Sequence, residues 1–441
     1  MDFSAVVSQQ VQQWIGAVEA MDIEPLARAT GFQKRSQRKI HIRDVVLGVM
    51  AVAATGRLSF ERVAASIARR ARQRYSKQAF HKRLDASVSG FLVAVFGRCL
   101  QPSLREAVAH GLFASFARVL LHDSTTITLP ARCAGHFPGS ANQRRRFSQL
   151  KIQVVCDLLR ARVEQLSLSG FTRNDQRAAP DILALLRPGD LIIRDLGYFV
   201  LSVFSAIIAC RAFFLSRYRY GVVVLDPRTQ RPIPLAKVLN KQGFFDAPVW
   251  LGEQARVPVR LVAVAVPDQV ANERRRKLRQ NRDQTLNPSK EHFYLLGWNL
   301  FVTNVSSQVW PAKQLPIIYR LRWRIETVFK AWKSYLALTE LNDRCLAMIH
   351  LSVMTKLIFC AFVYRTCQHL ELTRGTPACH VSILRLAKIL AAMALSLEAA
   401  FVKLTPQRLL AQLIDQHAFY EQRFDRLNFQ NYVLAAQSPL G

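Results

Sequence analysis

The most informative segment of this chain reads Tyr319-Arg320-Leu321-Arg322-Trp323-Arg324-Ile325-Glu326-Thr327-Val328-Phe329-Lys330-Ala331-Trp332-Lys333. An α-helix turns by about 100° per residue, so its polar residues gather within roughly 80° of one face. That face carries a single carboxylate, Glu326, among cations and a phenol: Tyr319, Arg322, Lys330 and Lys333. The opposite side is apolar, which predicts a helix docked on a core. A surface helix stabilised by ion pairs one turn apart, such as Glu326 with Arg322, is the simpler interpretation.

The spacing of these polar residues favours a function. Two residues separate Tyr319 from Arg322, three separate Arg322 from Glu326, and six separate Glu326 from Lys333. This spacing of Tyr, Arg, Glu and Lys is a specific pattern. The segment resembles the Y-R-E-K signature of the insertion-sequence-four family of DDE-type bacterial transposases. This resemblance implies that Glu326 is the third of three metal-binding carboxylates. It also implies that Tyr319, Arg322, Lys330 and Lys333 hold DNA phosphates near the cleavage point.

Two further carboxylates stand in β-strand patterns. Asp123 lies inside the β-branched, apolar run 119–127, and Asp195 ends the apolar run that starts at Asp190. A carboxylate among apolar neighbours is costly unless it is paired or binds a metal, although either residue alone is also compatible with a strand-end cap. The contexts Asp123-Ser124-Thr125-Thr126 and Asp195-Leu196-Gly197-Tyr198 resemble the family's first two catalytic segments. We expect Gly197 to permit the turn that follows Asp195.

The segments around these residues predict an α/β fold. Runs 150–159 and 162–168 read as antiparallel partners of the first strand, and 175–186 reads as a helix stopped by Pro188-Gly189. A helix over 199–210 and a strand over 212–216 follow Asp195. Alternation of strands and helices predicts layers, and the resemblance implies a ribonuclease-H-like core in which the first and fourth strands are neighbours. Asp123 and Asp195 would then meet.

The distance between Asp195 and Glu326, 131 residues, is too long for one helix and one strand. Residues 219–304 contain runs with β-strand patterns at 222–225, 248–251, 257–266 and 293–302, so we expect a β-rich insertion domain. The domain boundaries predicted are therefore 106–218 and 305–340 for the catalytic core and 219–304 for the insertion. Within the insertion, 273–282 is densely basic and includes Arg274, Arg275 and Arg276. We predict that these arginines contact DNA phosphates, a solvated loop being the alternative.

The flanking regions are predicted to be helical. Residues 1–105 contain three short helical patterns, 43–54, 59–70 and 76–84, with Ser59 and Ser76 as N-caps. The third pattern follows a basic stretch and resembles the family's DNA-reading N-terminal domain, so its first residues can enter a major groove. A packing helix with basic residues in solvent is the alternative. Residues 341–441 are rich in leucine and alanine and predict an all-α C-terminal region.

Composition points to a nucleic-acid partner. The chain has 61 Lys and Arg against 30 Asp and Glu, a formal net charge of +31, which favours binding to polyanions. Half of the residues are hydrophobic, which excludes a wholly disordered basic protein. The eight cysteines form no zinc-binding pattern. The start of the chain does not read as a signal peptide, and the apolar runs are too short or interrupted to span a membrane. We expect a cytoplasmic bacterial protein that associates with the nucleoid when bound to DNA.

The resemblance also implies a mechanism. Asp123, Asp195 and Glu326 would hold two Mg²⁺ ions, which Mn²⁺ can replace, since hard cations prefer oxygen ligands. Trp298 stands where related transposases keep an aromatic residue against a flipped base, a core tryptophan being the alternative. Cutting two double-stranded DNA ends and joining them to a target implies a homodimer in the DNA-bound synaptic complex. A ribonuclease-H-like nuclease without strand transfer and a catalytically silent DNA-binding descendant remain open as other functions.

Overall fold

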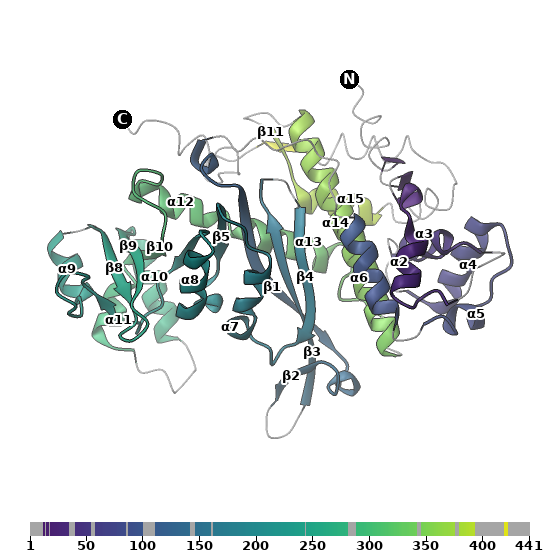
Figure 1. The fold of residues 1–441 in the computed structure, drawn as a ribbon, viewed down its shortest axis with the longest axis horizontal. Helices are drawn as coiled ribbons and strands as arrows, with labels where there is room; N and C mark the ends of the chain where they lie inside the picture. The colour runs from purple at the N-terminus through teal and green to yellow at the C-terminus, as the bar shows by residue number, and fades with distance from the viewer. Residues whose placement is uncertain are drawn as a thin grey trace.

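The protein, described here from a computed structural model, has a mixed α/β architecture built on one large sheet (Figure 1). The structure describes residues 12–13, 15–16, 18–34, 40–53, 58–84, 87–99, 111–141, 146–159, 162–242, 244–280, 288–341, 345–374, 379–392 and 419–421. Nine strands of the sheet follow the order β2-β3-β1-β5-β6-β10-β9-β8-β7, and a tenth, β4, pairs with β3. The predicted combination of α and β layers is confirmed.

The first half of the sheet carries the predicted catalytic strands. They are β1 (Arg118–Leu129), β2 (Pro138–Ala141), β3 (Arg146–Asp157), β4 (Arg162–Gly170), β5 (Asp190–Arg194) and β6 (Phe213–Arg217). β3 is antiparallel to both β1 and β4. β5 lies parallel to β1, with His122 level with Arg194, and parallel to β6 on its other side. The predicted adjacency of the two Asp-bearing strands is therefore confirmed, because Asp123 and Asp195 each follow the last paired residue of this register.

Successive residues of a strand point to opposite faces of a sheet, and both faces of this half are covered. One face packs against a large cluster that includes the C-terminal helices, and the other packs against α7 (Asp175–Ala178) and α8 (Leu201–Ala209). The predicted helix over 175–186 is only partly α-helical. It changes to the 3₁₀ helix η3 (Ala179–Ala184) where Pro180, which lacks an amide N–H, enters the chain.

The insertion continues the same sheet. Its strands are β7 (Val224–Leu225), β8 (Phe244–Leu251), β9 (Val257–Ala265) and β10 (Trp298–Thr303), and its helices are α9 (Leu235–Gln242), α10 (Asp268–Arg279) and α11 (Lys290–Leu295). β10 is antiparallel to β6, with Phe301 level with Arg217. One local expectation, and one alternative considered for the sequence, are wrong. Residues Phe293–Leu295 are helical, because Ser289 caps α11 through its hydroxyl, and most of the basic run 273–282 lies on α10 rather than in a loop.

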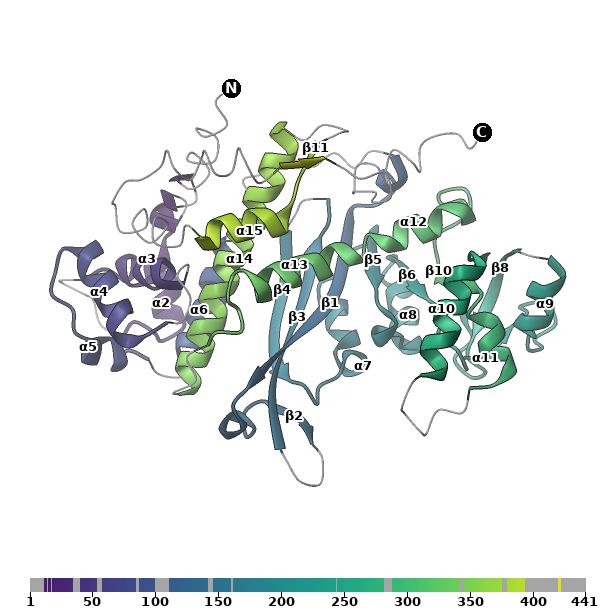
Figure 2. The same ribbon diagram turned by 180° about the vertical axis from the view of Figure 1, so that it is seen from behind.

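The Y-R-E-K segment forms two helices rather than one. α12 (Leu315–Arg320) and α13 (Trp323–Ser334) meet at Leu321 and Arg322, where the amide hydrogen bonds run to the residue three positions earlier. This tighter turn bends the segment without ending it. α13 lies across the face of β1 and β3 (Figure 2).

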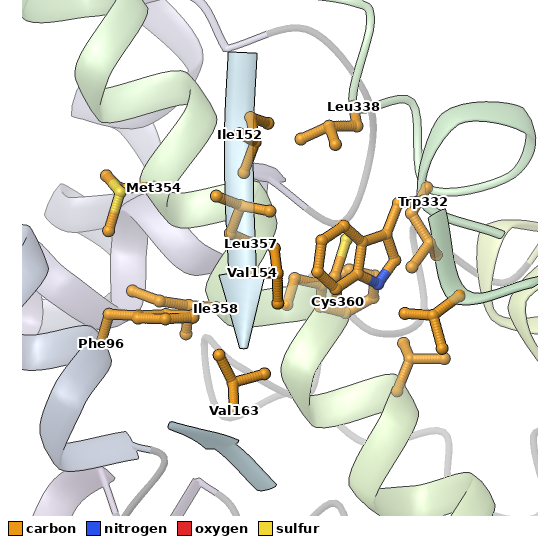
Figure 3. Packing of buried hydrophobic residues seen from close by; sticks show 14 of the residues in the cluster. Phe96, Ile152, Val154, Val163, Trp332, Leu338, Met354, Leu357, Ile358 and Cys360 are labelled. Carbon is orange, nitrogen blue, oxygen red and sulfur yellow. The ribbon is translucent and has the colours of Figure 1, made fainter. Parts of the chain in front are cut away.

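The apolar side of α13 is buried as predicted. Figure 3 shows Trp332 of this helix near Cys360 of the long helix α14 (Leu346–Arg374), in the same cluster of buried side chains as Ile152 and Val154 of β3. Trp332 is only 2% exposed. Glu326 therefore stands on a helix whose opposite side is fixed in the core.

The N-terminal region is helical and packs on α14. Its described helices are α2 (Ile23–Ala29), α3 (Ile42–Ala53), α4 (Phe60–Ala71), α5 (Lys77–His81) and α6 (Ser87–Cys99). The predicted N-caps are confirmed: the Ser59 hydroxyl accepts from the amide of Arg62, and the Ser76 hydroxyl accepts from that of Ala79.

The C-terminal region is mostly helical where it is described. α14 is followed by α15 (Ile383–Ala392), but the short pair β11 (Cys379–Val381) and β12 (Phe419–Glu421) departs from the all-α expectation. The expected helices over 393–418 and 422–432, the start of the chain before residue 12 and the basic residues 281 and 282 lie outside the described residues. Within the described ranges, no helix has the length and apolar character needed to cross a membrane.

Candidate active site

Three carboxylates from three separate elements converge on one guanidinium group. Arg322 Nη1 lies 2.6 Å from Glu326 Oε1 and 3.3 Å from Asp123 Oδ2, and Arg322 Nε lies 3.6 Å from Asp195 Oδ1. Asp123 comes from β1, Asp195 from the end of β5 and Glu326 from the first turn of α13. The structure therefore brings together the three acidic residues singled out in the sequence. The simple ion pair one turn apart, Glu326 with Arg322, is also present and belongs to this cluster.

Asp123 is the most enclosed of the three. Its side chain is 14% exposed, against 44% for Asp195 and 50% for Glu326. Burial raises the pKa of Asp123 to about 6, and the negative charges of Asp195 and Glu326 act in the same direction. The amide of Ser124 donates to Asp123 Oδ1 over 2.8 Å, and Arg322 provides the positive charge. Both stabilise the ionised form.

Tyr319 and Arg322 point into this cluster. The Tyr319 hydroxyl donates to Asp195 Oδ1 over 3.3 Å, and the Arg322 guanidinium lies 5.9 Å from the centre of the Tyr319 ring. Both residues are 8% exposed. In this structure their polar groups contact carboxylates, while Lys330 is exposed and Lys333 half-buried on the same helix.

The donor set fits a divalent cation of the hard type. All three groups offer carboxylate oxygens, the ligands that Mg²⁺ and Mn²⁺ prefer, and they already surround one positive charge. With Arg322 between them, however, no group of three or more acidic, histidine or cysteine side chains among the described residues is close enough to hold a metal ion. The three carboxylates could share a metal ion only if they moved closer together around the position that the Arg322 guanidinium occupies.

A second polar cluster supports the site from the other face of β1. Asp175 Oδ1 accepts hydrogen bonds from Ser124 Oγ over 2.9 Å and from Gln153 Nε2 over 3.1 Å, and it pairs with Lys151 Nζ at 2.8 Å. The Tyr198 hydroxyl donates to Gln153. Ser124 and Tyr198 are the residues that follow Asp123 and Asp195 in their motifs, so this cluster ties both motifs to one carboxylate.

Gly197 is explained by the same cluster. It does not adopt the positive φ that would require glycine. A Cβ atom at this position would lie 3.2–3.3 Å from the side chain of Asp175. The expected turn after Asp195 is present as the 3₁₀ helix η4 (Leu196–Tyr198), but it needs no positive φ at Gly197, and the missing side chain instead avoids close packing against Asp175.

Trp298 and two arginines of the insertion occupy structural positions. Trp298 is 8% exposed and belongs to the core formed by β8, β9 and β10, so the core tryptophan is the interpretation that the structure supports. Arg274 donates to the carbonyl groups of Leu296 and Trp298 and to Asn299 Oδ1. Arg275 donates to the carbonyl of Phe293 and to Asn272 Oδ1. In this structure the indole is buried and both guanidinium groups donate within the insertion, while the DNA contacts of these residues stay predictions. Arg276 is exposed.

Two residues near the site were missed in the sequence. Trp323 is 58% exposed and stands on α13 between Arg322 and Glu326. Arg217 ends β6, and extending the register of β6 with β5 by two residues places it level with Asp195. Burial lowers the pKa of Arg274, and the charge of Arg217 acts in the same direction. Both signals were present in the sequence: an aromatic residue within the polar face of the helix, and a charge that ends an apolar strand.

Comparison with known proteins defines the class. The family model described as the transposase DDE domain matches residues 114–362, more than half of the chain. The chain therefore belongs to this family, and it is a DDE-type DNA transposase of the bacterial insertion-sequence kind, as the Y-R-E-K resemblance predicted. Family membership implies dependence on a divalent metal ion.

Individual relatives agree with this assignment. The transposase for insertion sequence element IS231D of Bacillus thuringiensis subsp. finitimus is 26% identical over 335 residues, which cover 71% of this chain and 70% of the relative. The transposase for insertion sequence element IS1151 of Clostridium perfringens is 24% identical over 292 residues, covering 60% and 61%. Among solved structures, the piggyBac transposase synaptic complex with hairpin DNA matches with a TM-score of 0.46 at 11% identity, over 94% of this chain and 85% of that one.

Proposed function

We propose that this transposase cuts an insertion sequence at its terminal inverted repeats and joins it to target DNA by a cut-and-paste reaction centred on Asp123, Asp195 and Glu326. The observation that carries this proposal is the convergence of these three carboxylates, from β1, the end of β5 and α13, on one position. Three carboxylates 14–50% exposed form a site that a DNA backbone can reach and whose ionised state needs a cation.

The carboxylates would hold two Mg²⁺ ions, which Mn²⁺ can replace. When bound, such ions activate a water molecule or a 3′-hydroxyl group and stabilise the leaving oxygen. The chain's own cations then position the phosphates. Lys330 and Lys333 supply point charges on α13, Arg217 adds a cation beside Asp195, and Tyr319 orients Asp195 through its hydroxyl. Trp323, rather than Trp298, offers an exposed aromatic face for an unstacked base.

The proposal keeps the domain boundaries predicted from the sequence. Residues 106–218 and 305–340 form a ribonuclease-H-like catalytic core, and 219–304 form an insertion whose strands extend the core sheet. Residues 341–441 form the C-terminal region, which contacts α13 through the described helices α14 and α15.

Residues 1–105 form the DNA-reading region. α4 and α5 are joined by a short basic turn, and α5 exposes Lys77, Gln78 and His81 on one side. These side chains suit base edges and phosphates in a major groove. The transposase would act as a homodimer on two DNA ends in the cytoplasm, associated with the nucleoid.

Substitution of each carboxylate tests the assignment of the site. Asp123→Asn, Asp195→Asn and Glu326→Gln should each abolish Mg²⁺-dependent cleavage of a duplex carrying the element's own terminal repeat. Binding of that duplex, measured by anisotropy, should remain near that of the unmodified protein, because the basic surface is untouched. Near-normal cleavage by any of the three variants would remove that residue from the site.

The products distinguish the remaining alternatives. A transposase yields target DNA joined to both repeats, whereas a ribonuclease-H-like nuclease without strand transfer yields only cut ends. A catalytically silent descendant binds the repeats and yields neither product. Sizing of the cleavage-competent complex tests the dimer: two protein chains with two ends are expected, and one chain with one end would contradict it.

A further inference from the structure

Arg322 is the only described cation within ion-pair distance of the three catalytic carboxylates. Its side chain is 9% exposed, and its Nε has no hydrogen-bond partner although Asp195 lies 3.6 Å away. An arginine that serves only to bind DNA would be expected to present its planar fork to the outside. Here the fork is turned toward the interior of the site.

The local structure holds the side chain in this position. Arg322 occupies the bend between α12 and α13, one turn before Glu326, and lies beside the Tyr319 ring. Tyr319 donates in turn to Asp195. One guanidinium faces three carboxylates, so Arg322 neutralises only part of their negative charge. The contacts to Asp123 and Asp195, at 3.3 and 3.6 Å, are longer than charge-assisted hydrogen bonds of the strong kind.

We propose that Arg322 is a removable placeholder that occupies the position of the catalytic metal ions in the DNA-free protein and opposes metal loading until a DNA phosphate draws its guanidinium away. This inference rests on the proposed function, because it requires Asp123, Asp195 and Glu326 to be the metal ligands. It assigns Arg322 two anionic partners in turn, first the carboxylates and then the DNA backbone. Metal binding and DNA binding are thereby coupled.

The coupling follows from competition for the same oxygen atoms. Asp123 Oδ2, Asp195 Oδ1 and Glu326 Oε1 face the guanidinium, so a metal ion that uses these oxygens must displace it. A phosphate offers the guanidinium an equivalent bidentate partner and lowers the cost of that displacement. Thermodynamic linkage makes the coupling reciprocal: a bound metal ion strengthens phosphate binding by the same factor as a bound phosphate strengthens metal binding.

Substitution of Arg322 should affect metal affinity in the opposite direction to substitution of a metal ligand. Loss of the guanidinium removes a competitor, so DNA-free protein with Arg322→Gln should bind Mn²⁺ more tightly. The same variant leaves three carboxylates without a counter-charge, so it should unfold at a lower temperature without metal and gain more from added Mn²⁺. An arginine that only binds phosphate would change neither property.

The test is titration of the full-length, DNA-free protein with Mn²⁺, followed by electron paramagnetic resonance of the free ion. Arg322→Gln is expected to bind at least about tenfold more tightly than the unmodified protein, and Arg322→Lys to lie between them. Arg320→Gln removes the same charge from an exposed position two residues away and should change the affinity by less than about threefold. A terminal-repeat duplex should tighten Mn²⁺ binding by the unmodified protein and have little effect on Arg322→Gln.

The outcomes separate this inference from the proposed function. If Asp123→Asn binds Mn²⁺ as well as the unmodified protein, the metal site itself is misassigned. If Asp123→Asn loses binding while Arg322→Gln binds Mn²⁺ no better than the unmodified protein, the site stands and the placeholder is wrong. If Arg322→Gln does not fold, the same comparison with Arg322→Lys decides: affinity equal to or weaker than that of the unmodified protein overturns the inference.

Discussion

Ser124 Oγ donates a 2.9 Å hydrogen bond to Asp175 Oδ1, although the two residues lie 51 positions apart in the chain. Ser124 follows Asp123 and points to the opposite face of β1, away from the cluster of three carboxylates. Gly197 and Tyr198 reach the same cluster from the segment that follows Asp195. Asp175 thus links the two catalytic strands from behind.

Asp175→Asn should weaken both stability and cleavage. The substitution leaves Lys151, whose side chain is 6% exposed, without its ion-pair partner, and we expect a loss of about 2–3 kcal/mol in the free energy of unfolding. Ser124→Ala removes one hydrogen bond and should cost about 1 kcal/mol. Because β1 and the Asp195 segment lose their common support, cleavage by Asp175→Asn should fall by about tenfold or more, with DNA binding unchanged.

Asp181→Asn is the matched control for this prediction. Asp181 pairs with Arg173 through two 2.7 Å hydrogen bonds a few residues further along the chain, but both side chains are partly exposed. Its loss should cost at most about 1 kcal/mol and leave cleavage intact. Equal effects of the two substitutions on cleavage would contradict a supporting role for Asp175.

Neighbouring arginines of α10 should behave differently. Arg274→Ala removes three internal hydrogen bonds and should lower the free energy of unfolding by about 2 kcal/mol while leaving the salt dependence of DNA binding unchanged. Arg276→Ala should change stability by less than about 0.5 kcal/mol and flatten the slope of log affinity against log salt by about one unit. Chemical denaturation and binding at several salt concentrations measure both. A flattened slope for Arg274→Ala would return that residue to the DNA surface.

The sequence predicted the parts of the fold that depend on local pattern. The apolar runs around Asp123 and Asp195 form strands, Ser59 and Ser76 cap helices, and the apolar side of α13 is buried. The spacing of Tyr319, Arg322, Glu326 and Lys333 indicated the family, because these four residue types rarely occur by chance at these spacings.

What could not be predicted depends on tertiary contacts. The orientation of Arg322 depends on Asp195 and Asp123, which lie 127 and 199 residues earlier in the sequence. A basic residue on a polar helix face gives no sign of which anion it contacts. The internal hydrogen bonds of Arg274 and the burial of Trp298 could not be predicted for a similar reason: charge and aromaticity alone do not distinguish a hydrogen-bonded or buried side chain from an exposed one.

The two tryptophans can be separated experimentally. Trp298→Ala should lower the free energy of unfolding by about 3–5 kcal/mol, since it empties a core position. Trp323→Ala should change stability by about 1 kcal/mol or less but reduce cleavage of the terminal-repeat duplex, because the exposed ring is the surface available for a base. Trp323→Phe should retain part of the activity. Full cleavage by Trp323→Ala would exclude a role for the ring.

Lys356 is a buried cation outside the active site. It lies on α14 with no exposed surface and donates to the carbonyl of Ala337, a non-glycine residue with a φ of 50° in the segment that follows α13. Burial lowers the pKa of Lys356 to about 8, and the negative charge of Glu340 opposes this shift. The ammonium group therefore costs stability when it is charged in the folded protein.

This cost predicts a pH dependence of folding. The pKa of Lys356 is lower in the folded protein than in the unfolded chain, where it is near its ordinary value of 10.5. The unfolded state therefore binds more protons between about pH 8 and pH 10.5, and stability rises with pH across that interval. The shift corresponds to about 3 kcal/mol.

Relative to the unmodified protein, Lys356→Met should thus lose about that much of its stability between pH 8 and pH 10.5. Lys330→Met, which removes an exposed lysine, should differ from the unmodified protein by the same free energy of unfolding at both pH values. Urea unfolding at both pH values measures the two differences, and parallel pH profiles for the unmodified protein and Lys356→Met would show that Lys356 is not buried as a charge.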